Sequence, residues 1–145
     1  MMAMLSEKSC GAVVYSRSKS GLIYLLLQYE AGHWDFVKGN VEKGESEQET
    51  TLRELREETG ITDAFFIDDF CQSISYFYKR KGSTVQKEVV FFLMETKTIK
   101  IELSFEHICF EWLPFEQAFE KLTFKNARDV LKKADIFLKN RNKFA

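Results

Sequence analysis

One segment of the chain fixes the limits of a helix before anything else about the fold is known. It runs from Gly39 to Ile61 and reads GNVEKGESEQETTLRELREETGI. Ser46 followed by Glu49 is a capping box, in which each side chain satisfies a free backbone N–H of the other residue. Gly60 suits the left-handed backbone position just past a helix end. We therefore predict a helix over residues 46–59.

This helix divides its side chains between two faces, because successive residues turn by about 100°. The face expected to pack on a sheet carries Gln48, Leu52, Leu55 and Thr59. Three glutamates with helical spacing crowd on the opposite face, which we expect to be exposed: Glu54, Glu57 and Glu58. Like charges at this spacing repel and slightly destabilise a helix, and Arg53 and Arg56 offset part of that repulsion.

The acidic face has two interpretations. One is a solvated surface with salt bridges along the helix. The other is a site for a hard cation, because magnesium prefers oxygen ligands and is typically held by a few carboxylates together with substrate phosphates. Glu45, just before the helix, would add a further carboxylate. The order of residues around the glutamates decides between the two interpretations.

That order is Gly39, five residues, Glu45, seven residues, then Arg53-Glu54-Leu55-x-Glu57-Glu58-x-Gly60-Ile61. It resembles the Nudix box at every defined position. The resemblance implies an α+β protein with the Nudix fold, an α/β/α sandwich with a mixed sheet, in which the box forms a loop–helix–loop. Within the box, Leu55 and Ile61 would be packing residues.

The resemblance also implies a chemistry, the hydrolysis of a phosphoanhydride bond by water that attacks phosphorus. The implied cofactor is Mg²⁺, with Mn²⁺ as a substitute. Its implied ligands are Glu54, Glu57 and Glu58, with Glu106 outside the box. Gly39 would allow a tight turn near the metal, and Arg53 would orient a glutamate by ion pairing. The candidates for the general base are, in order, Glu58, Glu57 and Glu106.

Segments outside the box make the resemblance more specific. HWDFVKGNVEKGE (33–45), LSFEHICFEWLPFEQA (103–118) and LLLQ (25–28) look like the asymmetric diadenosine tetraphosphate hydrolases. By that resemblance, Lys38, His33 and Lys87 would contact substrate phosphates. Tyr76 would stack on the base, with Phe124 as a second aromatic. His107 is expected to be structural.

Two departures leave the substrate open. The basic stretch KRKGST, residues 79–84, is longer than expected, and Asp35-Phe36-Val37 stands where that family often carries prolines. The leading hypothesis is cleavage of diadenosine tetraphosphate to ATP and AMP. Its alternatives are ADP-ribose, an oxidised nucleoside triphosphate or an RNA 5′ end as substrate, a non-catalytic Nudix module, or a structural domain.

The rest of the chain predicts one domain, residues 1–145, in which strands dominate. Expected strands cover residues 9–16, 22–29, 34–38, 70–78, 86–95 and 108–112, with a short one at Ile101 and Leu103. Helical spacing of apolar residues follows Pro114, and a second apolar stripe runs from Ala127 to Leu138.

Composition limits which binding partners and which cellular compartment we expect for the protein. The net charge of −1 lacks the basic excess of a nucleic-acid binder, so a small nucleotide is the expected partner. Three widely spaced cysteines, Cys10, Cys71 and Cys109, are expected to be reduced core residues. The N-terminal residues show no secretory pattern, and no apolar run is long enough for a membrane. A cytoplasmic monomer is the expectation.

Overall fold

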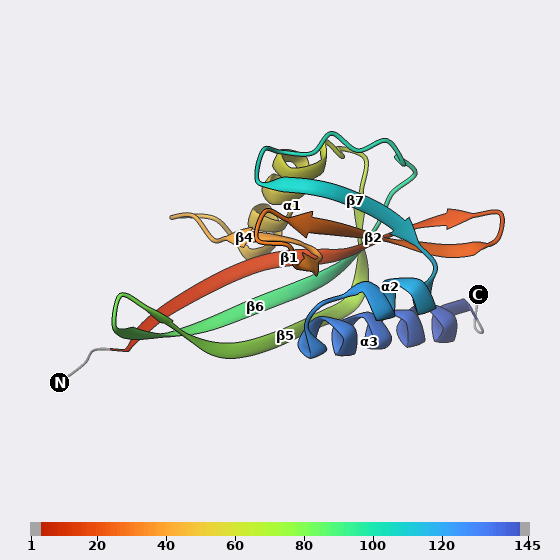
Figure 1. Ribbon diagram of the computed structural model, residues 1–145. Helices are drawn as coiled ribbons and strands as arrows, with labels where there is room; N and C mark the ends of the chain where they lie inside the picture. Colours follow the sequence, from red (N-terminus) through yellow and green to blue (C-terminus); the bar gives the residue numbers. More distant parts are fainter. Residues whose placement is uncertain (1–3, 143–145) are drawn as a thin grey trace.

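The computed structural model describes residues 4–142, which form seven strands and three helices (Figure 1). In chain order they are β1 (Leu5–Ser18), β2 (Gly21–Tyr29), β3 (Trp34–Asp35), β4 (Val37–Asn40), α1 (Glu47–Thr59), β5 (Phe65–Arg80), β6 (Ser83–Glu95), β7 (His107–Leu113), α2 (Phe115–Lys121) and α3 (Lys125–Asn142). That the whole chain is one domain stays a prediction, and residues 1–3 and 143–145 lie outside the described part.

All seven strands join one mixed sheet in which β1 is central. The order along the sheet is β3-β2-β1-β6-β5, while β4 pairs with β1 and β7 pairs with β2. β1 runs parallel to β6 and antiparallel to both β2 and β4. Because β4 lies beside the first half of β1, the loop and helix that follow β4 start from the middle of the sheet.

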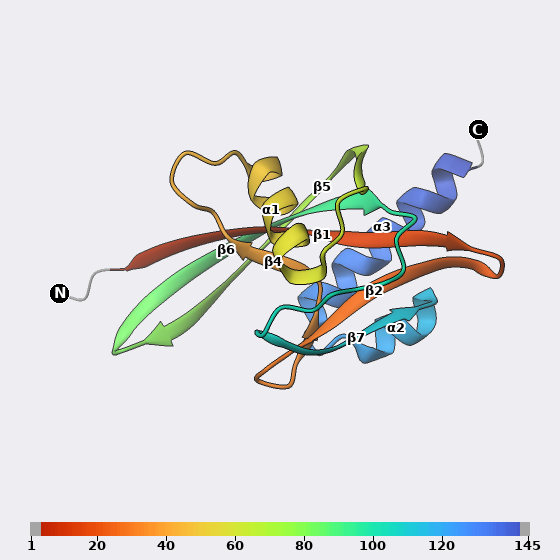
Figure 2. The same cartoon turned by 90° about the horizontal axis from the view of Figure 1, so that it is seen from above.

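Helices cover both faces of this sheet, α1 on one side and α2 with α3 on the other (Figures 1 and 2). Alternate residues of β1 supply the two cores: Val13 and Tyr15 face α3, whereas Ala12 and Val14 face α1. A strand buried on both faces reads as a nearly continuous apolar run, as the middle of β1 does. The predicted α/β/α sandwich is therefore confirmed.

The capping signals of α1 are confirmed in detail. The backbone N–H of Glu49 donates to Ser46 Oγ over 3.1 Å, and the N–H of Ser46 donates to Glu49 Oε1 over 2.9 Å. Gly60 ends the helix with a φ of 78°, and its N–H donates to the carbonyl of Arg56. The loop–helix–loop therefore begins and ends where the sequence indicated.

The buried face of α1 matches the predicted one only in part, because Leu55 and Thr59 are buried as expected but the other two residues are not. Leu52 is 45% exposed and Gln48 is exposed, so these two do not pack on the sheet. The buried side chains are Thr50, Thr51, Leu55, Glu58 and Thr59. The expectation that Glu58 lies on an exposed face was wrong, because the helix is rotated so that Glu58 turns inward beside Leu55.

The strand expected at Ile101 and Leu103 is also absent from the described structure. This stretch is an extended loop that binds the end of α1: the N–H of Glu102 donates to the carbonyl of Thr59 over 2.9 Å. Ile101 is buried and Glu102 exposed, so the alternation in the sequence reflects packing on a helix. The strand expected over residues 34–38 is divided into β3, which pairs with β2, and β4, which pairs with β1. The other predicted strands and helices are present, several of them longer than predicted.

The cysteines match the prediction only in part. All three are free thiols, but Cys10 alone is buried, while Cys71 is exposed and Cys109 is partly exposed. Over residues 4–142, no helix combines the length and the apolar character needed to cross a membrane.

Burial of α3 on the sheet leads to a stability prediction. Leu131 is fully buried between α3 and the sheet, so Leu131→Ala should lower the free energy of unfolding by about 2–5 kcal/mol. Ile136 on the same helix is 49% exposed, and Ile136→Ala should change it by no more than about 0.5 kcal/mol. Urea unfolding followed by circular dichroism measures both, and equal losses would contradict the assigned core.

Candidate active site

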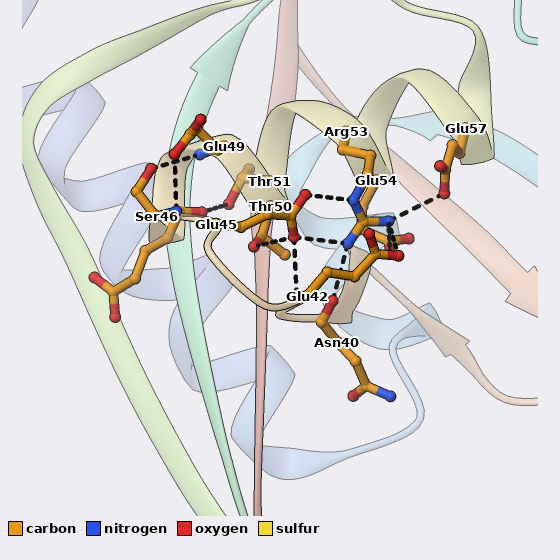
Figure 3. Close-up of polar contacts among 11 residues, drawn as sticks. Asn40, Glu42, Glu45, Ser46, Glu49, Thr50, Thr51, Arg53, Glu54 and Glu57 are labelled. Atoms are coloured by element: carbon orange, nitrogen blue, oxygen red, sulfur yellow. Dashed lines mark hydrogen bonds and ion pairs between the residues drawn. The ribbon is translucent and has the colours of Figure 1, made fainter.

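Arg53 joins the end of strand β4, the loop that follows it and helix α1 (Figure 3). Its Nε donates to Glu45 Oε2 over 2.6 Å and its Nη2 donates to Glu45 Oε1 over 3.0 Å, a bidentate pair. Nη2 also donates to the carbonyl oxygen of Asn40 at the end of β4 over 2.9 Å. On the helix itself, Nη1 lies 2.7 Å from Glu54 Oε1 and 3.2 Å from Glu57 Oε2.

Both carboxylate oxygens of Glu45 accept hydrogen bonds within this network. Glu45 accepts hydrogen bonds from the N–H of Glu42 and from Thr50 Oγ1 as well as from Arg53. The hydrogen bonds from Arg53, followed by the one from the Glu42 backbone, lower the pKa of Glu45 to about 2. Glu45 therefore holds Arg53 in place, and the carboxylates left for a cation are those of the helix.

The carboxylate of Glu54 explains why residue 39 is a glycine. Gly39 lies inside β4, paired with Cys10 of β1, so the tight turn expected at this position is absent. A Cβ built on Gly39 would stand 2.0 Å from Glu54 Cδ. The glycine thus leaves room for a carboxylate whose side chain is only 14% exposed, and burial raises the pKa of Glu54.

Glu58 is the most enclosed of the three box glutamates, at 3% exposure. The N–H of Lys38 donates to its Oε2 over 3.2 Å, and His107 Nε2 lies 3.2 Å from its Oε1 without being aligned for a hydrogen bond. Burial is the main cause that raises the pKa of Glu58 to about 7. Ser104 Oγ and His107 Nδ1 are 2.9 Å apart, which fixes the imidazole ring.

A cavity of about 790 Å³ lies against the box glutamates. It gathers eight of the site residues named from the sequence: Lys38, Gly39, Arg53, Glu54, Glu57, Glu58, Lys87 and Glu106. Lys87 Nζ donates to Asn40 Oδ1 over 2.8 Å, which holds its ammonium group at the wall of this cavity. Tyr29, Asn40 and Phe105 also line it, and sequence reasoning did not single them out.

The two remaining aromatic candidates line a second, smaller cavity of about 160 Å³. Tyr76 comes from β5 and Phe124 from the segment between α2 and α3, so the fold brings together residues far apart in the chain. Asn126 contributes an amide to the same wall. Lys38 borders both cavities, which makes them neighbours.

His33 lies beside these cavities in an aromatic stack. Its ring is stacked on Tyr29 with centroids 4.7 Å apart and tilted toward Phe124 at 5.4 Å. Burial lowers the pKa of His33.

The basic stretch 79–84 lies at the β5–β6 turn, where Arg80 Nη1 is 3.1 Å from Glu7 Oε2.

The donor set has the chemistry that a hard divalent cation requires. Glu54, Glu57 and Glu58 present only oxygen ligands to the same cavity, and Gly39 keeps space beside Glu54. Within residues 4–142, however, no three acidic, histidine or cysteine side chains already stand close enough to share one ion. Glu57 is 57% exposed and bound to Arg53, so its carboxylate must turn for the set to close around a cation.

A mixed sheet between helices carries a loop–helix–loop that presents glutamates and lysines to one cavity, an arrangement suited to holding a phosphate chain. The family model of the NUDIX domain matches residues 6–134, and the chain belongs to the Nudix hydrolase family. Enzymes of this family generally use divalent metals.

Similar proteins agree with this family assignment. The chain is 35% identical to the asymmetrical bis(5′-nucleosyl)-tetraphosphatase of Mus musculus, over 92% of this chain and 97% of that one. It is 33% identical to the RNA pyrophosphohydrolase of a Nitratiruptor species, over 77% of each chain. The crystal structure of a binary complex of the C. elegans Ap4A hydrolase superposes with a TM-score of 0.78 at 28% identity, covering 92% of this chain and 98% of that one.

The contact between Gly39 and Glu54 predicts a specific defect. Gly39→Ala should push the Glu54 carboxylate out of place and lower kcat at least about tenfold, while the thermal unfolding midpoint changes little. A double-mutant cycle with Glu54→Gln checks the cause, because Gly39→Ala should add almost no further loss on that background. Additive losses would show that Gly39 acts through something other than Glu54.

The raised pKa of Glu58 predicts a pH dependence of stability in the metal-free protein. The folded state keeps the proton up to about pH 7, whereas the unfolded state loses it near 4.5. Stability from this group is therefore fully present below pH 4.5 and is lost as pH rises to about 7, by on the order of 3 kcal/mol. Urea unfolding in chelator should show the decline in the wild type relative to Glu58→Gln, and parallel curves would contradict it.

Proposed function

We propose that this enzyme hydrolyses dinucleoside polyphosphates, converting diadenosine tetraphosphate to ATP and AMP with Mg²⁺ as cofactor and Mn²⁺ as a substitute. The observation that carries the proposal is the pairing of the two cavities at Lys38. One is lined by carboxylates and lysines, and the other by aromatic side chains. A substrate with a base at the end of a phosphate chain requires both kinds of surface. The likeness to the tetraphosphatases supports the same assignment.

In this proposal the lysines neutralise the phosphate chain. Lys38 borders both cavities, so its ammonium group is placed to bind a phosphate between the base and the metal site. In the structure its Nζ is 3.2 Å from Asp35 Oδ2, an ion pair that a phosphate would have to replace or share. Lys87 reaches the first cavity from β6, and burial lowers its pKa, which reflects the cost of enclosing a charge without a strong anionic partner.

The base is assigned to the cavity of Tyr76 and Phe124. Aromatic side chains offer flat apolar faces on which an adenine ring stacks favourably. Asn126 supplies an amide that can both donate and accept hydrogen bonds at the edge of the ring. His33 would support this site indirectly, because its ring stacks on Tyr29 and contacts Phe124. A direct contact between His33 and a phosphate would require a change of rotamer.

The reaction forms a bond between the oxygen of water and one phosphorus, while the anhydride P–O bond to the neighbouring phosphate breaks. The leaving phosphate takes the electron pair, and the water proton passes to a carboxylate. Glu58 is the first candidate for that base, because its carboxylate is enclosed at the wall of the cavity that would hold the phosphates; Glu57 and Glu106 line the same cavity and follow. When bound, the divalent cation neutralises developing charge and acidifies the water.

Arg53 has a positioning role in this proposal. Its guanidinium holds Glu54 and Glu57 on one side and is itself fixed by Glu45 on the other. If Glu57 held a cation, its carboxylate would have to leave its contact with Arg53. We also infer a cytoplasmic monomer without a nucleic-acid partner, an inference that rests on the composition alone.

A second candidate substrate is the triphosphorylated 5′ end of an RNA. The observation in its favour is the 33% identity to an RNA pyrophosphohydrolase. That substrate presents a phosphate chain with one terminal nucleoside at the site, followed by a polyanionic strand. The net charge of −1 gives little general attraction for such a strand, which ranks this candidate below the dinucleotide.

A substrate panel tests the proposed function. With Mg²⁺, kcat/KM for diadenosine tetraphosphate should exceed that for ADP-ribose, an oxidised nucleoside triphosphate and a triphosphorylated RNA by tenfold or more, and chelator should abolish activity. Glu57→Gln and Glu58→Gln should each lower kcat by about 10²-fold or more, because each removes a charged oxygen at the reacting phosphate.

Glu120→Gln on α2 is the matched control, since Glu120 is exposed and does not line the glutamate cavity, and it should retain wild-type kcat. Tenfold better turnover of another substrate would refute the choice of dinucleotide. Full activity and unchanged Mg²⁺ dependence in both site variants would refute the mechanism.

A further inference from the structure

Phe105 is a fully solvated aromatic side chain at the rim of the glutamate cavity. It is 91% exposed, the highest value among the exposed large hydrophobic residues, and it lines the same cavity as Glu57, Glu58 and Glu106. It makes no contribution to either hydrophobic core. Packing therefore does not account for an aromatic residue at this position.

The backbone on both sides of Phe105 is held in place. The N–H of Ser104 donates to the carbonyl of Glu58 over 3.3 Å, which ties the loop to the end of α1. The N–H of Glu30 donates to the carbonyl of Glu106 over 3.2 Å, which ties it to the turn after β2. Figure 1 shows this loop passing beside α1 before it enters β7. The exposed ring is thus presented from a fixed support, so little order has to be gained when a ligand stacks on it.

The position of Phe105 beside the two adjoining cavities indicates which part of a ligand would stack on its ring. Tyr76 and Phe124 line only the second cavity, Phe105 lines only the first, and Lys38 borders both. Aromatic surface is therefore present in both of these adjoining cavities, and the lysines and glutamates that would hold a phosphate chain line the cavity of Phe105. A dinucleoside polyphosphate carries matching groups, with a base at each end of an anionic chain.

We propose that Phe105 is the stacking platform for the second base of a dinucleoside polyphosphate, the base that the cavity of Tyr76 and Phe124 does not hold. This inference rests on the proposed function and adds to it a second nucleoside site. The ring is open to solvent on almost all sides and carries no polar group, so it recognises a base by stacking alone. Because every base has a flat aromatic face, this site should accept any nucleobase. The cavity that contains Asn126 should instead select among bases, because its amide can form hydrogen bonds with the edge of the ring.

The test compares a ligand with two bases and a ligand with one. For wild type and Phe105→Ala, KM is measured for diadenosine tetraphosphate, and the inhibition constant is measured for adenosine 5′-tetraphosphate as a competitor, whether or not it is hydrolysed. Phe105→Ala should raise the KM at least about fivefold, the loss expected for one base–aromatic stack, and leave the inhibition constant within about twofold. Phe105→Trp should keep a KM close to that of the wild type.

Phe77→Ala is the matched control, because Phe77 is also an exposed phenylalanine, at 62%, and does not line the glutamate cavity. It should leave both constants unchanged. An unchanged KM in Phe105→Ala, or equal losses for the two ligands, would overturn the inference while the wild type still hydrolyses the dinucleotide. A wild-type enzyme that does not hydrolyse diadenosine tetraphosphate would refute the proposed function itself, and the second nucleoside site would fall with it.

Discussion

The guanidinium of Arg53 organises the site, because it is the one group that touches the strand, the loop and the helix together. It binds the carbonyl of Asn40 in β4, both oxygens of Glu45 in the loop, and the carboxylates of Glu54 and Glu57 in α1. Without this cation, three acidic side chains would face one another across a short distance, at a cost in stability. One partly buried positive charge thus lets a helix present a concentrated negative surface to a cavity.

The carboxylates in this network occupy distinct environments, and the difference has chemical consequences. Glu45 is ionised and saturated with hydrogen bonds, so its oxygens are occupied by the protein itself. Glu58 is buried with its charge opposed by desolvation, and Glu57 is largely exposed and able to turn. In the proposed site a divalent cation would therefore meet one exposed ligand and two enclosed ones, which suits an ion that must share its coordination shell with substrate phosphates and water.

Local signals in the sequence predicted the helix limits, and tertiary packing decided what those signals could not. Ser46, Glu49 and Gly60 act on their own neighbours, so the cap and the helix end followed directly from the sequence. The buried face followed only in part: Leu55 and Thr59 are buried as predicted, but the burial of Thr51 was not foreseen. Its hydroxyl group donates to the helix carbonyl of Glu47, so it can be buried although it is polar.

The same distinction explains which candidate site residues were missed or misread. The box spacing identified Glu54, Glu57 and Glu58, and the structure places them with Lys38, Lys87 and Glu106 on one cavity. Nothing near His107 in the chain indicates that its ring would reach Glu58, because that contact depends on the loop folding back over α1. Gly39 was identified for the wrong reason, since spacing shows that a glycine stands there and only the fold shows that it makes room for a carboxylate.

The central claim is that the carboxylates of α1 bind a divalent cation beside a polyphosphate. A crystal structure with Mn²⁺ and a non-hydrolysable analogue of diadenosine tetraphosphate tests it most directly, because anomalous scattering locates the ion independently of the nucleotide. The account predicts an anomalous peak coordinated by oxygens of Glu54, Glu57 and Glu58 and by a phosphate oxygen, with one base between Tyr76 and Phe124. Nucleotide bound without a peak at those glutamates, or with the ion bound elsewhere, would contradict it.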